Sequence, residues 1–231
     1  MRDLRFPWVS AAIAALCLAV AWVPGGGEAL QYERARVAQG QVWLLLSGQL
    51  THWSVRMAWM DLGVLLGLAA WLEAGGRRRE MAFALGLGAV ATAGAVQLSP
   101  DLLVYRGSSG LASALFVLAA LGIARSSRGA TRGLALLATG LFLAKAAWEC
   151  RTGQALFAGP LAPGVRVVPM VHLLAGLAGA AATRQMVFPT SSATSKAPRL
   201  SIATPTGRPR ASPRSLTKPL STPRRPAGRT S

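Results

Sequence analysis

Acidic residues are scarce in this chain: eight Asp and Glu stand against 25 Lys and Arg, giving a formal net charge of +17 over 231 residues. There are only two cysteines, Cys17 and Cys150, and they have no metal-ligand spacing. A disulfide between them is possible, but cysteines in apolar surroundings are more often packing residues. The sequence therefore predicts no metal site and no cofactor.

A strongly basic chain can bind nucleic acid, but the placement of these charges favours a membrane protein. Hydrophobic residues make up 52% of the sequence and charged residues only 14%. Residues 1–189 hold all eight acids and every long apolar run, and their basic residues fall in short loops between those runs. Such a pattern is typical of membrane topology. We predict a membrane domain at 1–189 that contacts the lipid bilayer, and no nucleic-acid partner.

Residues 190–231 have a different composition. They contain nine Lys and Arg and seven of the fourteen prolines, with no acidic and no aromatic residue. Such a segment buries too little apolar surface to offset the entropy lost on ordering. We predict a disordered, Ser/Thr/Pro/Arg-rich cytoplasmic tail, weakly attracted to anionic lipids of the inner leaflet.

Six apolar segments predict an all-α bundle of six transmembrane helices. The first follows a basic start, which also describes a signal peptide, but no clear small-residue cleavage site follows it. Residues 28–50 contain an apolar run too short to span and are expected to lie on, or re-enter, the outer face. Glu73–Glu80 is expected to be a polar loop. The predicted spans are 6–27, 62–72, 81–98, 108–124, 133–148 and 169–187.

Basic residues predict the orientation of these spans. With both termini inside, the Arg77–Arg79 triplet, the arginines of 125–132 and the basic tail all lie on the inner side. The outer loops carry fewer basic residues. We predict a multi-pass protein of a cell inner membrane with both termini cytoplasmic. Several spans are near the lower limit of about 17 residues, which implies a thinned bilayer or recessed helices.

Polar residues at the outer ends of the spans indicate a candidate catalytic site. Ser109 lies in Gly107-Ser108-Ser109-Gly110 at the start of an apolar segment, where glycine permits a sharp turn and unpaired helix N–H groups suit an oxyanion. The same motif also fits a plain polar turn before a membrane helix. The topology places His172 at similar depth. Because a serine nucleophile needs a base and histidine is the usual one, we predict a Ser109–His172 pair.

The surroundings of this pair favour a dyad, since no carboxylate is near either residue in the sequence. Small residues follow both members and would let their helices approach closely. An interfacial histidine hydrogen-bonded to a loop is an equal alternative for His172. Lys145 and Glu149, four residues apart, are interpreted as a structural ion pair. The small residues are Ala175 and Gly179 after His172, and Ala112 and Ser113 after Ser109.

Five segments, taken in their order along the chain, resemble the rhomboid intramembrane serine proteases, and more narrowly their rhombosortase branch, over about residues 28–185. Gly107–Gly110 is similar to the family's G-x-S-G nucleophile motif, and Val171-His172 to its general-base helix. Leu30–Arg34 and Lys145–Glu149 resemble rhombosortase segments in particular. The family's second-helix motif, His-x4-His-x3-Asn, is matched in spacing by His52, Met57 and Asp61.

The resemblance implies a rhomboid-like bundle and a serine-type endopeptidase with Ser109 as nucleophile and His172 as base. It further implies that the backbone N–H of Ser109 and the His52 side chain hold the oxyanion beside Gly107, on the periplasmic or exterior face. The implied partners are membrane-anchored protein substrates, cut at C-terminal anchors that carry Gly-Gly-type sorting signals.

Several positions depart from the family pattern. Met57 replaces the histidine that helps to bind the oxyanion, and a thioether cannot donate a hydrogen bond; losing one such donor typically costs about 10²–10³ in rate. Asp61 stands in place of asparagine, and as a carboxylate it would repel an oxyanion unless it is protonated or acts through His52. Ser113 replaces an aromatic or histidine, and Trp43-Leu44 lacks an arginine often found there.

These departures keep a second hypothesis open, a catalytically inactive rhomboid-like pseudoprotease that binds membrane clients. Met57 favours that hypothesis, whereas the retained Ser109 and His172 favour a protease. A small transporter would require ionisable residues through the middle of the membrane, and the polar residues here gather at one face.

Overall fold

The structure is a computed structural model, and it describes residues 7–22, 24–154, 156 and 168–184. The chain divides into two units, Met1–Thr190 and Ser191–Ser231, and every described residue lies in the first. The tail predicted at 190–231 lies outside the described residues, as do residues 157–167 of the loop before the last helix.

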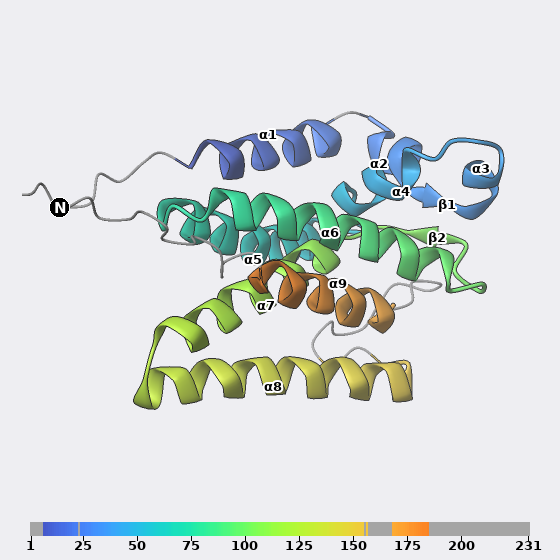
Figure 1. Ribbon diagram of the computed structural model, residues 1–231. Coiled ribbons are helices and arrows are strands. Elements are labelled where there is room, and N and C mark those ends of the chain that lie inside the picture. Colours follow the sequence, from blue (N-terminus) through green and yellow to red (C-terminus); the bar gives the residue numbers. More distant parts are fainter. Residues whose placement is uncertain (1–6, 23, 155, 157–167, 185–231) are drawn as a thin grey trace, which may run out of the picture. The chain divides into compact units, whose positions relative to one another are not determined.

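The described residues are mostly helical (Figure 1). Two two-residue strands pair antiparallel, with Tyr32 opposite Tyr105. In chain order the elements are α1 (Trp8–Trp22), α2 (Gly26–Leu30), β1 (Tyr32–Glu33), α3 (Arg34–Ala38), α4 (Leu44–Ser47), the 3₁₀ helix η1 (Gly48–Leu50), α5 (Val55–Ala74), α6 (Arg78–Gln97), β2 (Val104–Tyr105), α7 (Ser109–Ser126), α8 (Gly129–Thr152) and α9 (Pro169–Ala182).

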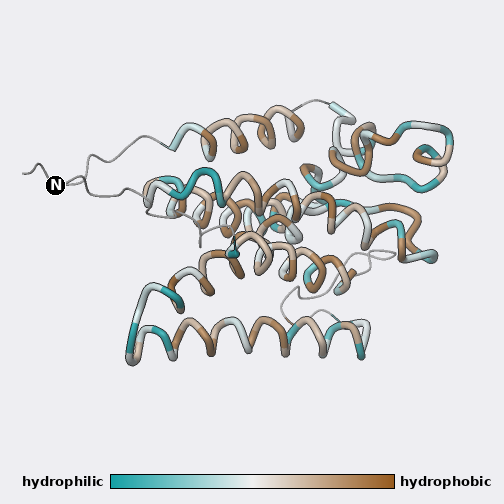
Figure 2. Tube along the Cα trace, viewed as in Figure 1, coloured by the Kyte–Doolittle hydropathy of each residue, from teal (hydrophilic) through white to brown (hydrophobic). Residues whose placement is uncertain are grey.

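Four of these helices, α5 to α8, are long and apolar enough to cross a membrane. Figure 2 shows apolar residues along the helices and hydrophilic ones concentrated at their ends and turns. Helices α1 and α9 lie in segments predicted as spans, but they have 15 and 14 residues, below the roughly 17 that a crossing needs. The helical fold with four helices able to span is therefore established for the described residues, and six crossings stay a prediction.

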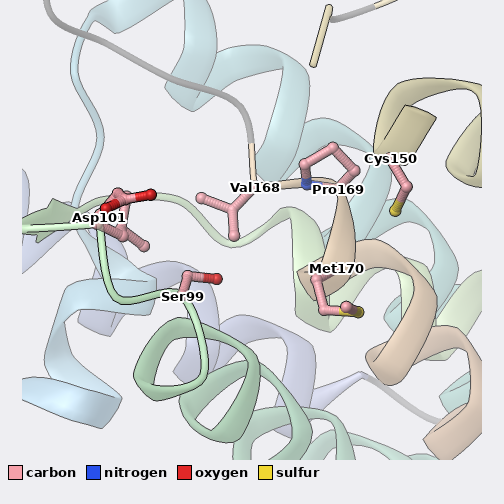
Figure 3. Close-up of a pocket in the computed structure, with 7 residues that line it drawn as sticks. Ser99, Asp101, Cys150, Val168, Pro169 and Met170 are labelled. Carbon is pink, nitrogen blue, oxygen red and sulfur yellow. The ribbon is translucent and has the colours of Figure 1, made fainter. Parts of the chain in front are cut away.

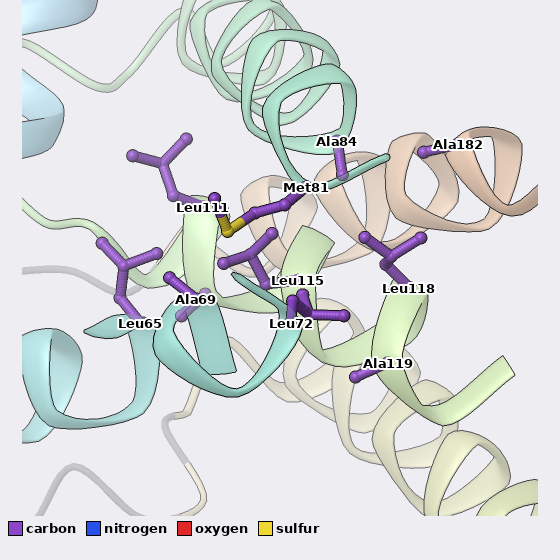
Figure 4. Packing of buried hydrophobic residues seen from close by; sticks show 11 residues of the cluster. Leu65, Ala69, Leu72, Met81, Ala84, Leu111, Leu115, Leu118, Ala119 and Ala182 are labelled. Atoms are coloured by element: carbon purple, nitrogen blue, oxygen red, sulfur yellow. The ribbon is translucent and has the colours of Figure 1, made fainter. Parts of the chain in front are cut away.

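Helix α7 lies at the centre of the packing, in contact with α5, α6, α8 and α9. Its leucines meet those of α5 and small residues of α6 and α9 in a buried apolar cluster (Figure 4). Because α7 is enclosed by its neighbours, both of its ends are held in place. The cluster comprises Leu65, Ala69, Leu72, Met81, Ala84, Leu111, Ala112, Leu115, Leu118, Ala119 and Ala182.

Helices α7 and α9 approach each other through small residues, as predicted, although on α7 the residues differ from those expected. A Cβ added at Gly179 would overlap the Ala114 backbone, and one at Gly110 would overlap Val171 and Thr92. The face that α7 turns to α9 therefore consists of Gly110 and Ala114, four residues apart. Among the residues predicted there, Ala112 joins the leucine cluster. Ser113 donates its hydroxyl to the carbonyl oxygen of Ser109 at 2.8 Å.

The segment between α1 and α5, expected on the outer face, folds into short helices that brace the start of α7. The carbonyl oxygen of Gly48 accepts the Gly107 N–H at 3.2 Å. The Arg34 guanidinium donates to the carbonyl oxygens of Val96 and Ser99, at 3.1 and 2.8 Å, where α6 ends. These bonds satisfy carbonyl groups that a helix leaves unpaired at its C-terminus.

Glu73 lies in the last turn of α5 and is 1% exposed, so its prediction as part of a polar loop is wrong. Its carboxylate accepts the backbone N–H groups of Val9 and Ser10, at 3.1 and 3.0 Å, and pairs with Arg78 at 2.9 Å. The first N–H groups of a helix have no partner within it. Glu73 therefore caps α1 from another helix. Of the two cysteines, which are both free, Cys17 is buried in α1 and Cys150 is exposed.

Candidate active site

The predicted site residues lie on or next to three helices, α5, α7 and α9. Ser109 is the first residue of α7, His172 lies in the first turn of α9, and His52 precedes α5. Figure 1 shows the start of α7, the end of α8 and the start of α9 at one end of the helices, with the turns joining α5 to α6 and α7 to α8 at the other. The predicted pair is thus placed at one level, away from the arginine-rich turns.

Ser109 and His172 lie within hydrogen-bond distance across the contact between α7 and α9. The Ser109 Oγ is 3.1 Å from the His172 Nε2. Pro169 occupies the first turn of α9, where its missing N–H costs nothing. The small-residue contact between Gly179 and Ala114 lies further along both helices and lets the backbones approach closely. A hydroxyl and an imidazole at this separation suit proton transfer.

A carboxylate also faces His172, which the sequence analysis did not predict. The Oε2 of Glu149 is 3.3 Å from the His172 Nδ1. The predicted ion pair with Lys145 is present at 2.7 Å, made by the other carboxylate oxygen. Glu149 lies 23 residues from His172, and only the packing of α8 against α9 brings the two together. The signal that could have found it is an acid near the outer end of a span.

His52 occupies the α5 side of the site and is almost enclosed. Its side chain is 7% exposed, and its Nε2 lies 3.7 Å from the Asp61 carboxylate. The same nitrogen is 3.3 Å from the Ser108 hydroxyl oxygen. Burial lowers the pKa of His52 to about 4, so the ring is neutral at pH 7 and Nε2 can serve only one of these groups as a donor. His52 therefore supports the turn before Ser109 and does not contact the Ser109 hydroxyl in this arrangement.

The Asp61 carboxylate lies beside the turn at Gly107, close to the backbone N–H groups of Ser108 and Ser109. In acyl transfer by a serine, backbone N–H groups at this position are the donors that hold the oxyanion. A carboxylate here places an acidic group next to those donors. Asp61 lies at the predicted site, but in a role opposed to the asparagine of the family motif.

Gly107 and Tyr105 shape the turn that leads to these donors. Gly107 has φ +144°, which favours glycine, and a Cβ there would lie 3.4 Å from a carboxylate oxygen of Asp61. The buried Tyr105 hydroxyl donates to the Gly107 carbonyl oxygen at 2.9 Å. Burial, and then the nearby Asp61 carboxylate, raise the pKa of Tyr105. The phenol therefore stays protonated and keeps donating this bond.

Met57 lies one turn before Asp61 on α5, so both residues share a face of that helix. Its backbone N–H donates to the Ser54 hydroxyl at 3.2 Å, which caps the start of α5. Its thioether supplies no donor. The structure therefore leaves the place of the family's second histidine without a side-chain N–H.

A shallow pocket of about 260 Å³ lies beside the start of α9 (Figure 3). Among the described residues that line it, neither Ser109 nor His172 appears. In the same described part of the chain, no group of three His, Cys, Asp or Glu side chains could hold a metal ion. The lining residues are Ser99, Asp101, Leu102, Cys150, Val168, Pro169 and Met170.

A comparison of the chain with protein-family models finds no match, and no curated protein or solved structure is significantly similar to it.

Proposed function

We propose that this chain is an intramembrane serine endopeptidase in which Ser109 is the nucleophile and His172 the general base. The observation that carries the proposal is the 3.1 Å separation of the Ser109 Oγ from the His172 Nε2 at matching ends of two apolar helices. His172 takes the Ser109 proton as the hydroxyl oxygen attacks a peptide carbonyl, and then gives that proton to the leaving amine. Water hydrolyses the acyl-enzyme and restores the serine.

The oxyanion of this reaction needs donors, and the Asp61 carboxylate lies beside the backbone N–H groups that Ser108 and Ser109 offer. Catalysis therefore requires the Asp61 carboxylate to move aside or to become protonated when a substrate carbonyl arrives. Its substitution for asparagine is expected to slow the reaction without removing the nucleophile and base.

The substrate class follows from the resemblance to rhombosortases: C-terminal membrane anchors of exported proteins with a Gly-Gly-type sorting signal. The site would open to the periplasmic or exterior side of the inner membrane, with both termini of the six-span protein in the cytoplasm. The arginine-rich turns at the end of the helices remote from Ser109 support this orientation.

A pseudoprotease that binds membrane clients is the second candidate. It is favoured by the Asp61 carboxylate beside the Ser108 and Ser109 N–H groups and by the thioether of Met57. A binder of this kind would keep the bundle and the substrate contacts, and it would lack hydrolysis.

Labelling by a fluorophosphonate probe in detergent separates these candidates. The wild-type protein should be labelled, and Ser109→Ala and His172→Ala should each abolish labelling. Ser126→Ala, at the far end of α7 with its hydroxyl bonded to the Gly122 carbonyl oxygen, is the matched control and should label like wild type. No labelling of wild type, under conditions in which an active membrane serine hydrolase reacts, would favour the binder. Cleavage of a co-expressed reporter with a Gly-Gly-type anchor then tests the substrate class.

A further inference from the structure

Glu149 is buried beside His172, and both of its carboxylate oxygens have partners. Its side chain is 2% exposed, and its Oε2 lies 3.3 Å from the His172 Nδ1. Its Oε1 accepts from the Lys145 ammonium at 2.7 Å and from the Leu156 backbone N–H at 3.0 Å. Three elements of the chain therefore meet at one carboxylate: α8, the segment that follows it, and α9.

We infer that Glu149 is a positioning residue that completes a Ser109–His172–Glu149 chain, and that Lys145 holds Glu149 in place. The inference rests on the serine hydrolase function proposed above. It changes the predicted dyad into a triad, and it changes the predicted structural ion pair into part of the catalytic apparatus.

The hydrogen-bond partners of His172 determine which tautomer its neutral ring adopts. An ionised carboxylate can only accept a hydrogen bond. The Nδ1 of His172 therefore carries the hydrogen and donates a hydrogen bond to Glu149. A neutral imidazole has one N–H, which leaves Nε2 with a free lone pair facing the Ser109 Oγ. That tautomer is the one a general base requires. In the other tautomer Nε2 would carry hydrogen and could not accept the serine proton.

The proton balance of the first step is then complete. The Ser109 Oγ forms a bond to the substrate carbonyl carbon, the π electrons of the carbonyl move to its oxygen, and the Ser109 proton moves to Nε2 of His172. The ring becomes an imidazolium that donates a hydrogen bond to Glu149 from Nδ1, while Glu149 keeps its negative charge. When the carbonyl re-forms, the carbon–nitrogen bond breaks and the proton on Nε2 passes to the leaving amine.

Lys145 explains why a buried carboxylate stays ionised here. An unpaired charge in an apolar environment is costly, whereas a carboxylate with two or more donors is stabilised. Lys145 lies one turn before Glu149 on α8, and its side chain is 25% exposed. It can therefore neutralise Glu149 while its own ammonium reaches the solvent or headgroup region.

The test uses the whole chain, purified without a histidine tag, so that its two histidines are the only imidazoles present. Histidine ¹⁵N labelling and long-range ¹H–¹⁵N correlation spectra report which ring nitrogen carries hydrogen, and His52→Gln assigns the two rings. Wild-type His172 should show the Nδ1–H tautomer. Glu149→Gln should lose it and lower the rate of fluorophosphonate labelling by about 10²–10⁴-fold, whereas Glu149→Asp should keep the tautomer and recover part of the rate.

Glu73→Gln is the matched control, because Glu73 is equally buried and also paired with a basic residue, but lies in the last turn of α5, at the end of the helices remote from the start of α7, where it caps α1. It should lower stability and leave the His172 tautomer and the labelling rate unchanged. A wild-type Nε2–H tautomer, or a Glu149→Gln protein that labels at the wild-type rate, would overturn the inference. Absence of labelling in wild type with the Nδ1–H tautomer present would instead overturn the proposed hydrolase function alone.

Discussion

The α7–α9 side of the site and the α5 side are organised differently. On the first side each polar group has the partner that nucleophilic catalysis requires, from the Ser109 hydroxyl through His172 to Glu149. On the second side Met57 supplies no donor, and the Asp61 carboxylate lies beside the backbone N–H groups that an oxyanion would use. In the proposed enzyme the nucleophile and the base are therefore in contact, whereas the oxyanion site has a carboxylate beside it, and we expect substitutions to alter the two sides separately.

The largest effect is expected where the two helices touch. Gly179→Leu places a side chain against the Ala114 backbone, so α7 and α9 must separate, and we expect loss of fluorophosphonate labelling. The free energy of unfolding should also fall by about 1–3 kcal/mol or more. Thermal unfolding in detergent measures the second quantity. Gly86→Leu on α6, where an added Cβ meets nothing within 4 Å, should change neither, and equal damage by both variants would contradict the prediction.

The next effect concerns the neutral His52 on the α5 side. Its folded-state pKa is about 4, below the 6.5 of an unperturbed histidine. Between these two pH values the unfolded chain binds more protons than the folded protein. The free energy of unfolding is therefore highest above pH 6.5 and falls as the pH drops toward 4. The loss should reach about 3 kcal/mol at most. Unfolding measured across this range should show it, and His52→Gln should remove this component; an unchanged pH slope in the variant would contradict the assignment.

Met57→His should add a hydrogen-bond donor to the α5 side, so that both sides of the site have the polar groups that the proposed reaction requires. We expect the fluorophosphonate labelling rate to rise by about tenfold or more, since a single oxyanion donor is typically worth about 10²–10³. An equal rise in the labelling rate of Met57→Leu, which adds no donor, would show that the shape of the side chain and not hydrogen bonding causes the rise. An unchanged rate would mean that another donor already acts there.

A smaller gain is expected from Asp61→Asn, which removes the negative charge next to the Ser108 and Ser109 N–H groups. The labelling rate should rise several-fold, by less than the effect of a new donor. Glu28→Gln removes an exposed acid of α2 and serves as the control for net charge. A slower Asp61→Asn enzyme would show that the carboxylate itself assists the reaction.

The fold was predictable as far as local sequence determines it. Apolar runs and basic loops are local properties, and each predicted span overlaps one of the apolar helices, although α5 and α8 extend beyond the spans predicted at 62–72 and 133–148. Helix α9 is shorter than the span predicted at 169–187, because the polar Thr183 and Arg184 end the apolar run directly after Ala182, and the prediction extended past them. The prediction of which α7 residues contact α9 was also wrong. Ala112 and Ser113 are small, but the rotation of the helix turns Gly110 and Ala114 toward α9.

The site was predictable where residue chemistry is distinctive. A serine between glycines and one of only two histidines could be paired by depth alone, and the structure places them in contact. Glu149 was not assigned to the site, although its place near the outer end of a span was a signal for it, because its contact with His172 depends on the rotation of α8. The position of Asp61 beside the Ser108 and Ser109 N–H groups likewise arises from a turn, at Gly107, whose path no side-chain pattern specifies.

The cap that Glu73 places on α1 has a consequence for biogenesis. Helix α1 is synthesised before α5, so the partner of its leading N–H groups is made more than 60 residues later. During insertion those groups must rely on water or lipid headgroups, and α1 can dock only after α5 has emerged. A mutation at Glu73 would therefore delay assembly in the membrane while leaving the finished nucleophile and base untouched.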